Sequence, residues 1–101
     1  MIKFLFIKEN KKIKKINIQG HALYSSKGKD IVCASVSTAI IMTLNIIELL
    51  ELNSNISYSL KEGFFSLRLL KFEDTINKLL MNLEYTLKDL SKTYSKYLKE
   101  E

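Results

Sequence analysis

The stretch GHALYSSKGKDIVCASVS, residues 20–37, separates a strand-forming N-terminal segment from the longest apolar run of the chain. It holds the only histidine, His21, and the only cysteine, Cys33, and a glycine-flanked polar loop joins them. Asp30 precedes the apolar run and is predicted to be a helix N-cap, which places Cys33 in the first helical turn. Free N–H groups and the helix dipole favour a thiolate there, so a cysteine nucleophile with a histidine base is one hypothesis for this stretch.

Two strands are predicted before this stretch. Apolar residues alternate with others over residues 2–7, and again near residues 15–19, which is typical of half-buried strands. A turn at residues 9–11 joins them, so the two strands make a hairpin that ends at Gly20. Ile13 is out of phase with this alternation and predicts a β-bulge.

After the loop, the segment from Ile31 to about Glu51 is predicted to be a helix that is apolar nearly all round. Such a helix is expected to be buried on most sides, by the sheet on one side and by a partner subunit on another. Its length approaches that of a membrane span. Polar residues interrupt it, however, so a core helix is favoured and no membrane association is expected.

The remaining chain predicts a second pair of strands and a second helix. Residues 56–60 and 65–69 alternate in polarity and flank a hairpin turn at Lys61-Glu62-Gly63. Apolar residues at helical spacing predict an amphipathic helix from about Glu73 to Lys92. For Tyr94–Glu101, a frayed helix end and a short fifth strand remain open.

The resulting order, ββαββα, predicts one α+β domain over residues 1–101, an antiparallel sheet with both helices packed on it. A single cysteine excludes an internal disulfide and fits a reducing compartment. The N-terminal residues have too few apolar side chains before the first charges for a signal peptide, so a cytoplasmic protein is expected. One cysteine and one histidine do not make a metal site, and no cofactor is implied.

The net charge is +5, and much of it comes from a cluster of lysines at the first hairpin. One interpretation is attraction to RNA or to an RNA-rich particle such as a ribosome. The favoured interpretation is a solvated hairpin, because no aromatic residue is interleaved with the lysines as base stacking requires. Direct nucleic-acid binding is therefore not expected. The cluster consists of Lys8, Lys11, Lys12, Lys14 and Lys15.

Taken alone, His21 and Cys33 do not decide the function. A lone cysteine at a helix start is most often a small buried apolar residue, and a lone histidine beside a glycine is most often a surface residue. The serines of the stretch lack the glycine pattern of a nucleophile elbow. A non-enzymatic basic module that associates with ribosomes or RNA therefore stands as the alternative to a cysteine enzyme.

The pattern as a whole resembles a known signature. Gly20-His21-Ala22, then Gly28, then Asp30-Ile31-Val32-Cys33-Ala34 and Val36-Ser37 resemble the signature of the ribosomal-processing cysteine proteases called Prp. The loop between histidine and cysteine has the family's usual length. Two positions depart from the family pattern, Lys27 before the loop glycine and Ser35 after the cysteine motif, and they bear on loop packing and fine specificity.

The resemblance implies a bacterial cytoplasmic endopeptidase that forms a homodimer. Such enzymes remove an N-terminal extension from large-subunit ribosomal protein twenty-seven, cutting after an aromatic residue in a segment with alternating hydrophobic residues. The resemblance also implies that His21 and Cys33 form a catalytic dyad. Gly20, Asp30 and Ser37 match further positions of the signature. Ser37 is expected to hold local hydrogen bonds.

Several roles in the loop remain predictions. Asp30 is expected chiefly to cap the helix, and the alternative is that it orients His21. The backbone N–H of Cys33 or of a neighbour is expected to stabilise the oxyanion. Residues 22–29 are expected to form a mobile lid that brings His21 to Cys33 on substrate binding, with Leu23 and Tyr24 contacting the substrate and Gly28 allowing the movement.

Overall fold

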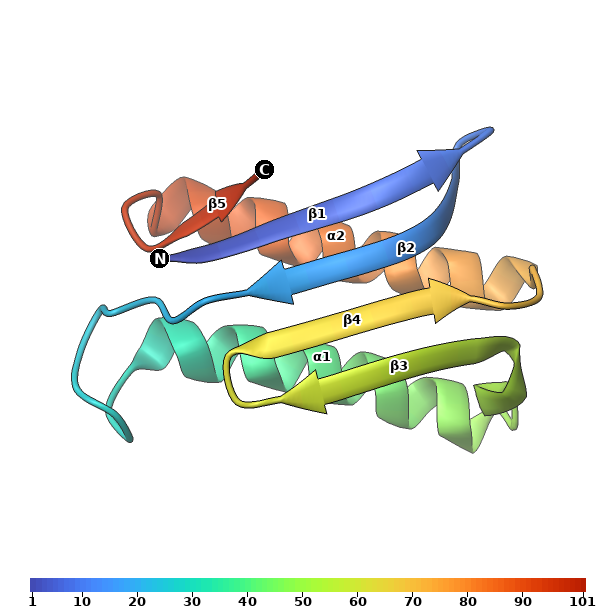
Figure 1. Ribbon diagram of the computed structural model, residues 1–101, viewed down its shortest axis with the longest axis horizontal. Coiled ribbons are helices and arrows are strands. Elements are labelled where there is room, and N and C mark those ends of the chain that lie inside the picture. The colour runs from blue at the N-terminus through green and yellow to red at the C-terminus, as the bar shows by residue number, and fades with distance from the viewer.

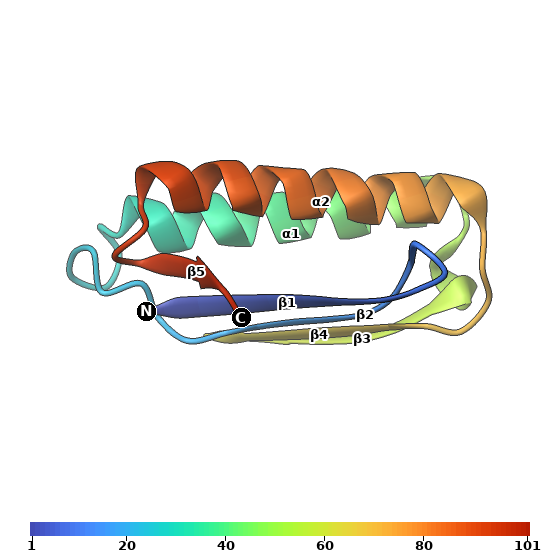
Figure 2. The same ribbon diagram turned by 90° about the horizontal axis from the view of Figure 1, so that it is seen from above.

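The computed structural model describes all 101 residues as a two-layer α+β domain. Both helices lie side by side on one face of a single sheet, and the other face is open (Figure 1, Figure 2). In chain order the elements are β1 (Ile2–Glu9), β2 (Lys12–Gln19), α1 (Ile31–Leu49), the short 3-10 helix η1 (Asn53–Asn55), β3 (Ile56–Lys61), β4 (Phe64–Leu69), α2 (Asp74–Thr93) and β5 (Leu98–Glu100). The predicted order ββαββα is confirmed, and the C-terminal segment contains a fifth strand.

The sheet has the strand order β3-β4-β2-β1-β5 and is mixed. The first four strands are antiparallel neighbours, as predicted, but β5 pairs with β1 in parallel. The expectation of a purely antiparallel sheet is therefore wrong at this edge. The reason is α2, which carries the chain back along the whole sheet, so that β5 starts beside the start of β1 and runs in the same direction (Figure 1).

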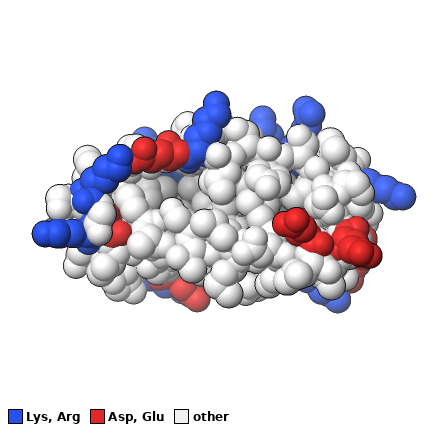
Figure 3. Space-filling model, turned by 90° about the horizontal axis from the view of Figure 1, so that it is seen from below, with Lys and Arg blue, Asp and Glu red and all other residues white.

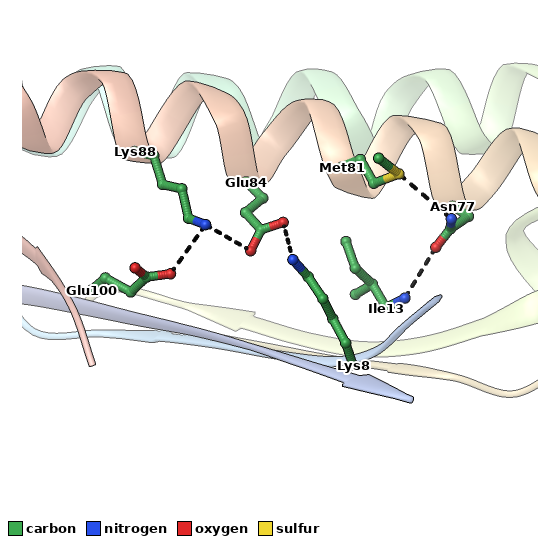
Figure 4. Close-up of polar contacts among 7 residues, drawn as sticks. All are labelled: Lys8, Ile13, Asn77, Met81, Glu84, Lys88 and Glu100. Carbon is green, nitrogen blue, oxygen red and sulfur yellow. Dashed lines mark hydrogen bonds and ion pairs between the residues drawn. The ribbon is translucent and has the colours of Figure 1, made fainter. Parts of the chain in front are cut away.

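A bulge sits in the β1–β2 hairpin, where the sequence predicted one. Ile7 pairs with Lys15 and Lys8 pairs with Ile13, so Lys14 is the additional residue. The shift turns Ile13 into the core, where its side chain is fully buried. Its backbone N–H bonds the Oδ1 of Asn77 on α2, at 3.0 Å (Figure 4). The bulge therefore locks the hairpin to the second helix.

The core lies between the sheet and the two helices, and α2 is amphipathic as predicted. One stripe of α1 is buried against the sheet, as predicted, and several large apolar side chains of its other faces are exposed in the single chain, so the predicted cover by a partner subunit stays a prediction. By length and composition α1 could cross a membrane, a property that core helices share. The buried apolar residues of α1 are Val32, Val36, Ile40, Leu44 and Ile47, and the exposed ones include Ile31, Ile41, Met42, Ile46 and Leu49.

Glu84 on α2 is the one charged side chain in the core, with 3% of its surface exposed. One carboxylate oxygen lies 2.9 Å from Nζ of Lys8, the other lies 3.5 Å from Nζ of Lys88, and Lys88 also lies 3.5 Å from Glu100 (Figure 4). The negative charge of Glu84 raises the pKa of Lys88 above 10.5, with Glu100 adding to the effect against the opposing influence of burial. The network therefore joins β1, α2 and β5.

Replacing Glu84 with Gln is expected to lower the free energy of unfolding by about 1–3 kcal/mol, because both lysines lose their anionic partner. Urea denaturation measures this, and Asp89→Asn, which removes the exposed partner of Lys92, is the control with an expected change below about 0.5 kcal/mol. The part of this stability that comes from Lys88 is fully present below the ordinary pKa of lysine. It is lost as the pH rises through the raised pKa of Lys88 in the folded state. Equal stability of the two variants would contradict the prediction.

Candidate active site

The loop that carries His21 begins at Gly20, a position that requires glycine. Its φ is +106°, and a Cβ there would collide with the backbone carbonyl of Met1. The Gly20 N–H donates to the carbonyl of Gly63, in the turn between β3 and β4, at 2.9 Å. The end of β2 is thus fixed between β1 and the β3–β4 turn, and the chain enters the loop in a defined direction.

His21 lies against Gly63. A Cβ built on Gly63 would stand 2.6 Å from Nε2 of the imidazole, so a larger residue there would require the ring to shift. The sequence marked Gly63 as a turn residue and did not reveal this role, because the contact joins segments about 40 residues apart in the chain. Gly63 is therefore an additional residue of the candidate site.

Cys33 lies in the first turn of α1 and is partly buried. Its Sγ accepts a hydrogen bond from the backbone N–H of Ala22 at 3.3 Å. Ala22 is itself almost fully buried, which holds this donor in place. In this structure Sγ of Cys33 is hydrogen-bonded to the Ala22 N–H, and the imidazole of His21 packs against Gly63. No hydrogen bond joins the side chains of His21 and Cys33.

Asp30 binds four backbone N–H groups. Its Oδ1 accepts from Val32 and Cys33, both at 3.0 Å, and its Oδ2 accepts from Tyr24 at 2.9 Å and Ser25 at 3.3 Å. Burial opposes ionisation of the carboxyl group, but the hydrogen bonds from Cys33, Ser25, Tyr24 and Val32 outweigh it and lower the pKa below 3.8. The predicted cap is confirmed. Asp30 makes no hydrogen bond to His21, and its second oxygen ties the loop to the helix instead.

The hydrogen bonds of Asp30 also bear on the prediction that an N–H group at the helix start stabilises the oxyanion. The N–H groups of Val32 and Cys33 are occupied by Asp30, and the N–H of Ala34 donates to the Asp30 carbonyl at 3.0 Å. The expectation that the Cys33 N–H is available to a substrate is therefore wrong in this structure. Ala22 supplies the N–H that points to Sγ of Cys33.

The loop is held at more points than the sequence indicated. The ring of Tyr24 packs edge-on against Tyr94 and Tyr97, with centroids 5.7 and 5.0 Å apart. Lys27 forms an exposed ion pair with Glu62 at 3.1 Å. Tyr24 thus contacts the C-terminal segment in this structure, and its predicted contact with substrate stays a prediction. The mobility of residues 22–29 stays a prediction.

A groove of about 650 Å³ runs along this end of the molecule, between the loop, the start of α1 and the β3–β4 turn. His21 and Cys33 both line it, together with the predicted residues Gly20, Leu23, Gly28, Asp30 and Ser37. The hydroxyl of Ser37 makes no hydrogen bond within the chain, contrary to its predicted role, and it is Ser35 that bonds the carbonyl of Ile31, at 2.7 Å. Apolar side chains that line the groove include Ile18, Ile31, Ile40, Leu60, Phe64 and Phe65.

An extended peptide with apolar side chains fits such a groove, and a thiol at its wall with an imidazole close by suits attack on a peptide carbonyl. No group of three or more histidine, cysteine, aspartate or glutamate side chains is placed to hold a metal ion. The family model described as cysteine protease Prp matches residues 1–99. The chain belongs to the Prp family. It is a cysteine protease.

Solved structures agree with this assignment at the level of the fold. The ribosomal processing protease Prp from S. aureus, in complex with a covalently linked product peptide, superposes with a TM-score of 0.89 at 23% identity, over 99% of this chain and 97% of that chain. The same protease with a substrate peptide gives 0.80 at 21% identity, over 100% and 98%. SMU.848 from Streptococcus mutans gives 0.77 at 23% identity, over 100% and 92%. No curated protein matches the chain in sequence.

Two substitutions of Asp30 are expected to separate its two roles. Asn keeps an oxygen for the cap but presents an NH₂ group to the N–H donors of Tyr24 and Ser25, whereas Ala removes both acceptors. Asp30→Ala should lower the free energy of unfolding by about 0.5–2 kcal/mol, and Asp30→Asn should lower it less, because Asn keeps the helix cap. Both should speed hydrogen exchange of the Tyr24 and Ser25 amides.

Urea denaturation and amide exchange by mass spectrometry test this pair, and unchanged exchange at Tyr24 and Ser25 would contradict it. The lowered pKa of Asp30 also fixes the direction of the pH effect. Its stabilising contribution is full above the ordinary value of 3.8 and is lost as the pH falls through the lowered, folded-state value. The wild-type advantage over Asp30→Ala should therefore disappear in acid.

Proposed function

We propose that this Prp protease is a cytoplasmic endopeptidase that removes an N-terminal extension from large-subunit ribosomal protein twenty-seven, with Cys33 as nucleophile and His21 as base. The observation that supports this most strongly is one groove that holds both the single cysteine, in the first turn of a helix, and the single histidine. The S. aureus Prp structures, one with a covalently linked product peptide and one with a substrate peptide, support a peptide substrate for this chain.

In the proposed mechanism His21 takes the thiol proton of Cys33, and Sγ forms a bond to the scissile carbonyl carbon. The oxyanion of the tetrahedral intermediate lies next to the sulfur, where the Ala22 N–H can donate to it. His21 then gives the proton to the leaving amine as the C–N bond breaks, and water hydrolyses the thioester with His21 again as base. His21 must leave its position on Gly63 for these steps.

The groove also supports the substrate class. Its apolar side chains lie along both walls, from β3 and β4 on one side and from α1 on the other. An extension with alternating hydrophobic residues that ends in an aromatic residue, which the family resemblance implies, would bury those side chains there.

Replacing Cys33 with Ala should abolish cleavage of a ribosomal protein that carries the extension, while the fold is retained. Mass spectrometry of the products measures cleavage, and circular dichroism monitors the fold. Ser35→Ala is a matched control two residues along α1, because it removes a hydroxyl that bonds only within the helix. Cleavage by the Cys33→Ala protein would overturn the dyad, and an intact, folded wild type without cleavage would favour the non-enzymatic ribosome-associated module.

We also propose that the protein is a homodimer through the exposed apolar face of α1. Ile41, Met42, Ile46 and Leu49 are 38–81% exposed in the single chain, and Figure 3, which views the molecule from the side of β3 and α1, shows a broad surface with few charges. Contiguous apolar surface of this kind is typical of protein–protein contacts.

Light scattering should give about twice the monomer mass of 11.7 kDa, since a stable dimer buries such a surface. Met42→Lys should shift the mass toward the monomer, because burying a charge in an apolar interface is costly. Tyr85→Lys, at an exposed position of α2, is the control and should leave the mass unchanged. A wild-type mass near 11.7 kDa at all concentrations would refute the dimer.

A further inference from the structure

The open face of the sheet, on the side away from both helices, has a chemical character that the protease site does not explain. Cross-strand pairing sorts its outward side chains into three rows. The row nearest the active-site loop contains, from β5 to β3, Lys99, Lys3, Gln19, Phe64 and Lys61. The middle row contains Leu5, Asn17, Ser66 and Ser59, and the far row contains Ile7, Lys15, Arg68 and Ser57. We refer to these residues together as the sheet face.

The charged side chains in these three rows are all positive. The cations of the sheet face are exposed and take part in no ion pair, whereas the lysines of the chain that have acidic partners lie elsewhere. The nearest acidic residues in the chain are Glu9 at the end of β1, Glu62 in the β3–β4 turn, Glu100, which pairs with Lys88 of α2, and Glu101, whose N–H bonds the carbonyl of Phe4 after the end of β5. In Figure 3 the sheet forms the upper side, where several blue side chains project and one acidic side chain lies among them at the left. The five cations are Lys3, Lys15, Lys61, Arg68 and Lys99.

Two of the cross-strand pairs place like charges directly opposite each other. Lys3 pairs with Lys99, and Lys15 pairs with Arg68. Such pairs are destabilising, and no acidic side chain lies between them to offset the repulsion. The isolated domain therefore gains nothing from this arrangement, whereas an anionic partner bound across the sheet would relieve it.

We propose that the sheet face binds single-stranded RNA. The first and third rows lie four residues apart along the strands, a separation of about 13 Å, so that one strand of nucleic acid can meet cations from both. Between them Asn17, Gln19 and Ser66 offer neutral hydrogen-bonding groups. Phe64, with 36% of its surface exposed, presents a ring on which a base can stack. With only one aromatic ring, binding is dominated by phosphates and tolerates any sequence.

This proposal departs from the expectation drawn from the lysine cluster of the first hairpin. The structure separates that cluster into different environments. Lys8 reaches into the core and bonds Glu84, and Lys12 lies 4.2 Å above the ring of Phe72. Lys15 instead joins cations from the four other strands and shares its face with Phe64. Aromatic and basic side chains that are far apart in the sequence are thus brought together by the register.

The sheet face adjoins the proposed peptide groove, because Gln19, Lys61 and Phe64 also line that groove. An RNA strand on the sheet and a peptide in the groove would therefore lie side by side. The proposed dimer face on α1 belongs to the opposite layer and leaves the sheet open (Figure 2). The inference rests on charge and register alone and holds whether or not the peptide substrate is the one proposed above.

Fluorescence anisotropy with a labelled single-stranded RNA of mixed sequence, about 20 nucleotides long, tests the proposal on the full chain. Wild-type affinity should fall about 20- to 100-fold between about 50 and 200 mM KCl, as expected for neutralising about three to five phosphates. Lys15→Gln/Arg68→Gln should weaken binding at least about fivefold and reduce the salt slope by about 1–2. Lys71→Gln/Lys96→Gln, which removes two exposed, unpaired lysines outside the sheet face, should change the affinity less than about twofold.

If both double variants weaken RNA binding equally, the effect comes from net charge alone and the proposal is overturned. The proposal is also overturned if the wild type does not bind RNA at low salt. Binding to vesicles that contain phosphatidylserine is measured in a parallel experiment. If the protein binds these vesicles but not RNA, the partner of the sheet face is a membrane surface and not RNA. Removing opposed like charges should not lower the melting temperature. If Lys15→Gln/Arg68→Gln fails to fold, Lys3→Gln/Lys99→Gln, which removes the other opposed pair, gives the same comparison.

Discussion

The carboxylate of Asp30 is the interaction on which the rest of the site depends. Its two oxygens bind four backbone N–H groups, two from the helix start and two from the loop. The helix thereby begins at a fixed residue, so Cys33 takes a fixed place in its first turn. The same carboxylate holds the loop against the start of the helix, so that the Ala22 N–H bonds Sγ of Cys33 and His21 lines the groove. One ionised side chain thus positions both halves of the proposed dyad through the backbone.

The two layers leave the molecule with faces of different chemistry. The helix layer has acidic partners for its lysines and an apolar strip on α1, while the sheet layer has unpaired cations. The buried Glu84 network joins the last strand to this arrangement, since it connects α2 to both β1 and β5. Because β5 follows Tyr94 and Tyr97, which pack on Tyr24, the C-terminal segment also supports the active-site loop from outside the groove.

Local patterns predicted most of the fold. Alternation at β1, β3 and β4, the amphipathic period of α2 and the cap at Asp30 are properties of adjacent residues, and the structure confirms them. What the sequence did not reveal depends on contacts between distant segments. The parallel direction of β5, the place of Gly63 under His21 and the packing of Tyr24 on the C-terminal tyrosines follow from topology. A wholly apolar helix also does not indicate which side the chain itself covers, and the structure shows that this side is the stripe from Val32 to Ile47.

These contacts also bear on how the base could reach the nucleophile. Ala22 is buried and its N–H is held on Sγ, so the backbone at His21, one residue before it, is fixed near the sulfur already. Tyr24 and Ser25 are held by Asp30, which restrains the chain on the other side of Ala22. A closure of the whole loop is therefore not needed to bring the imidazole to Cys33. A change of the His21 side-chain rotamer, away from Gly63, is a smaller and faster movement that leaves every one of these hydrogen bonds in place. On this view the anchored part of the loop holds the site ready, and the predicted movement on substrate binding is expected in residues beyond Ser25.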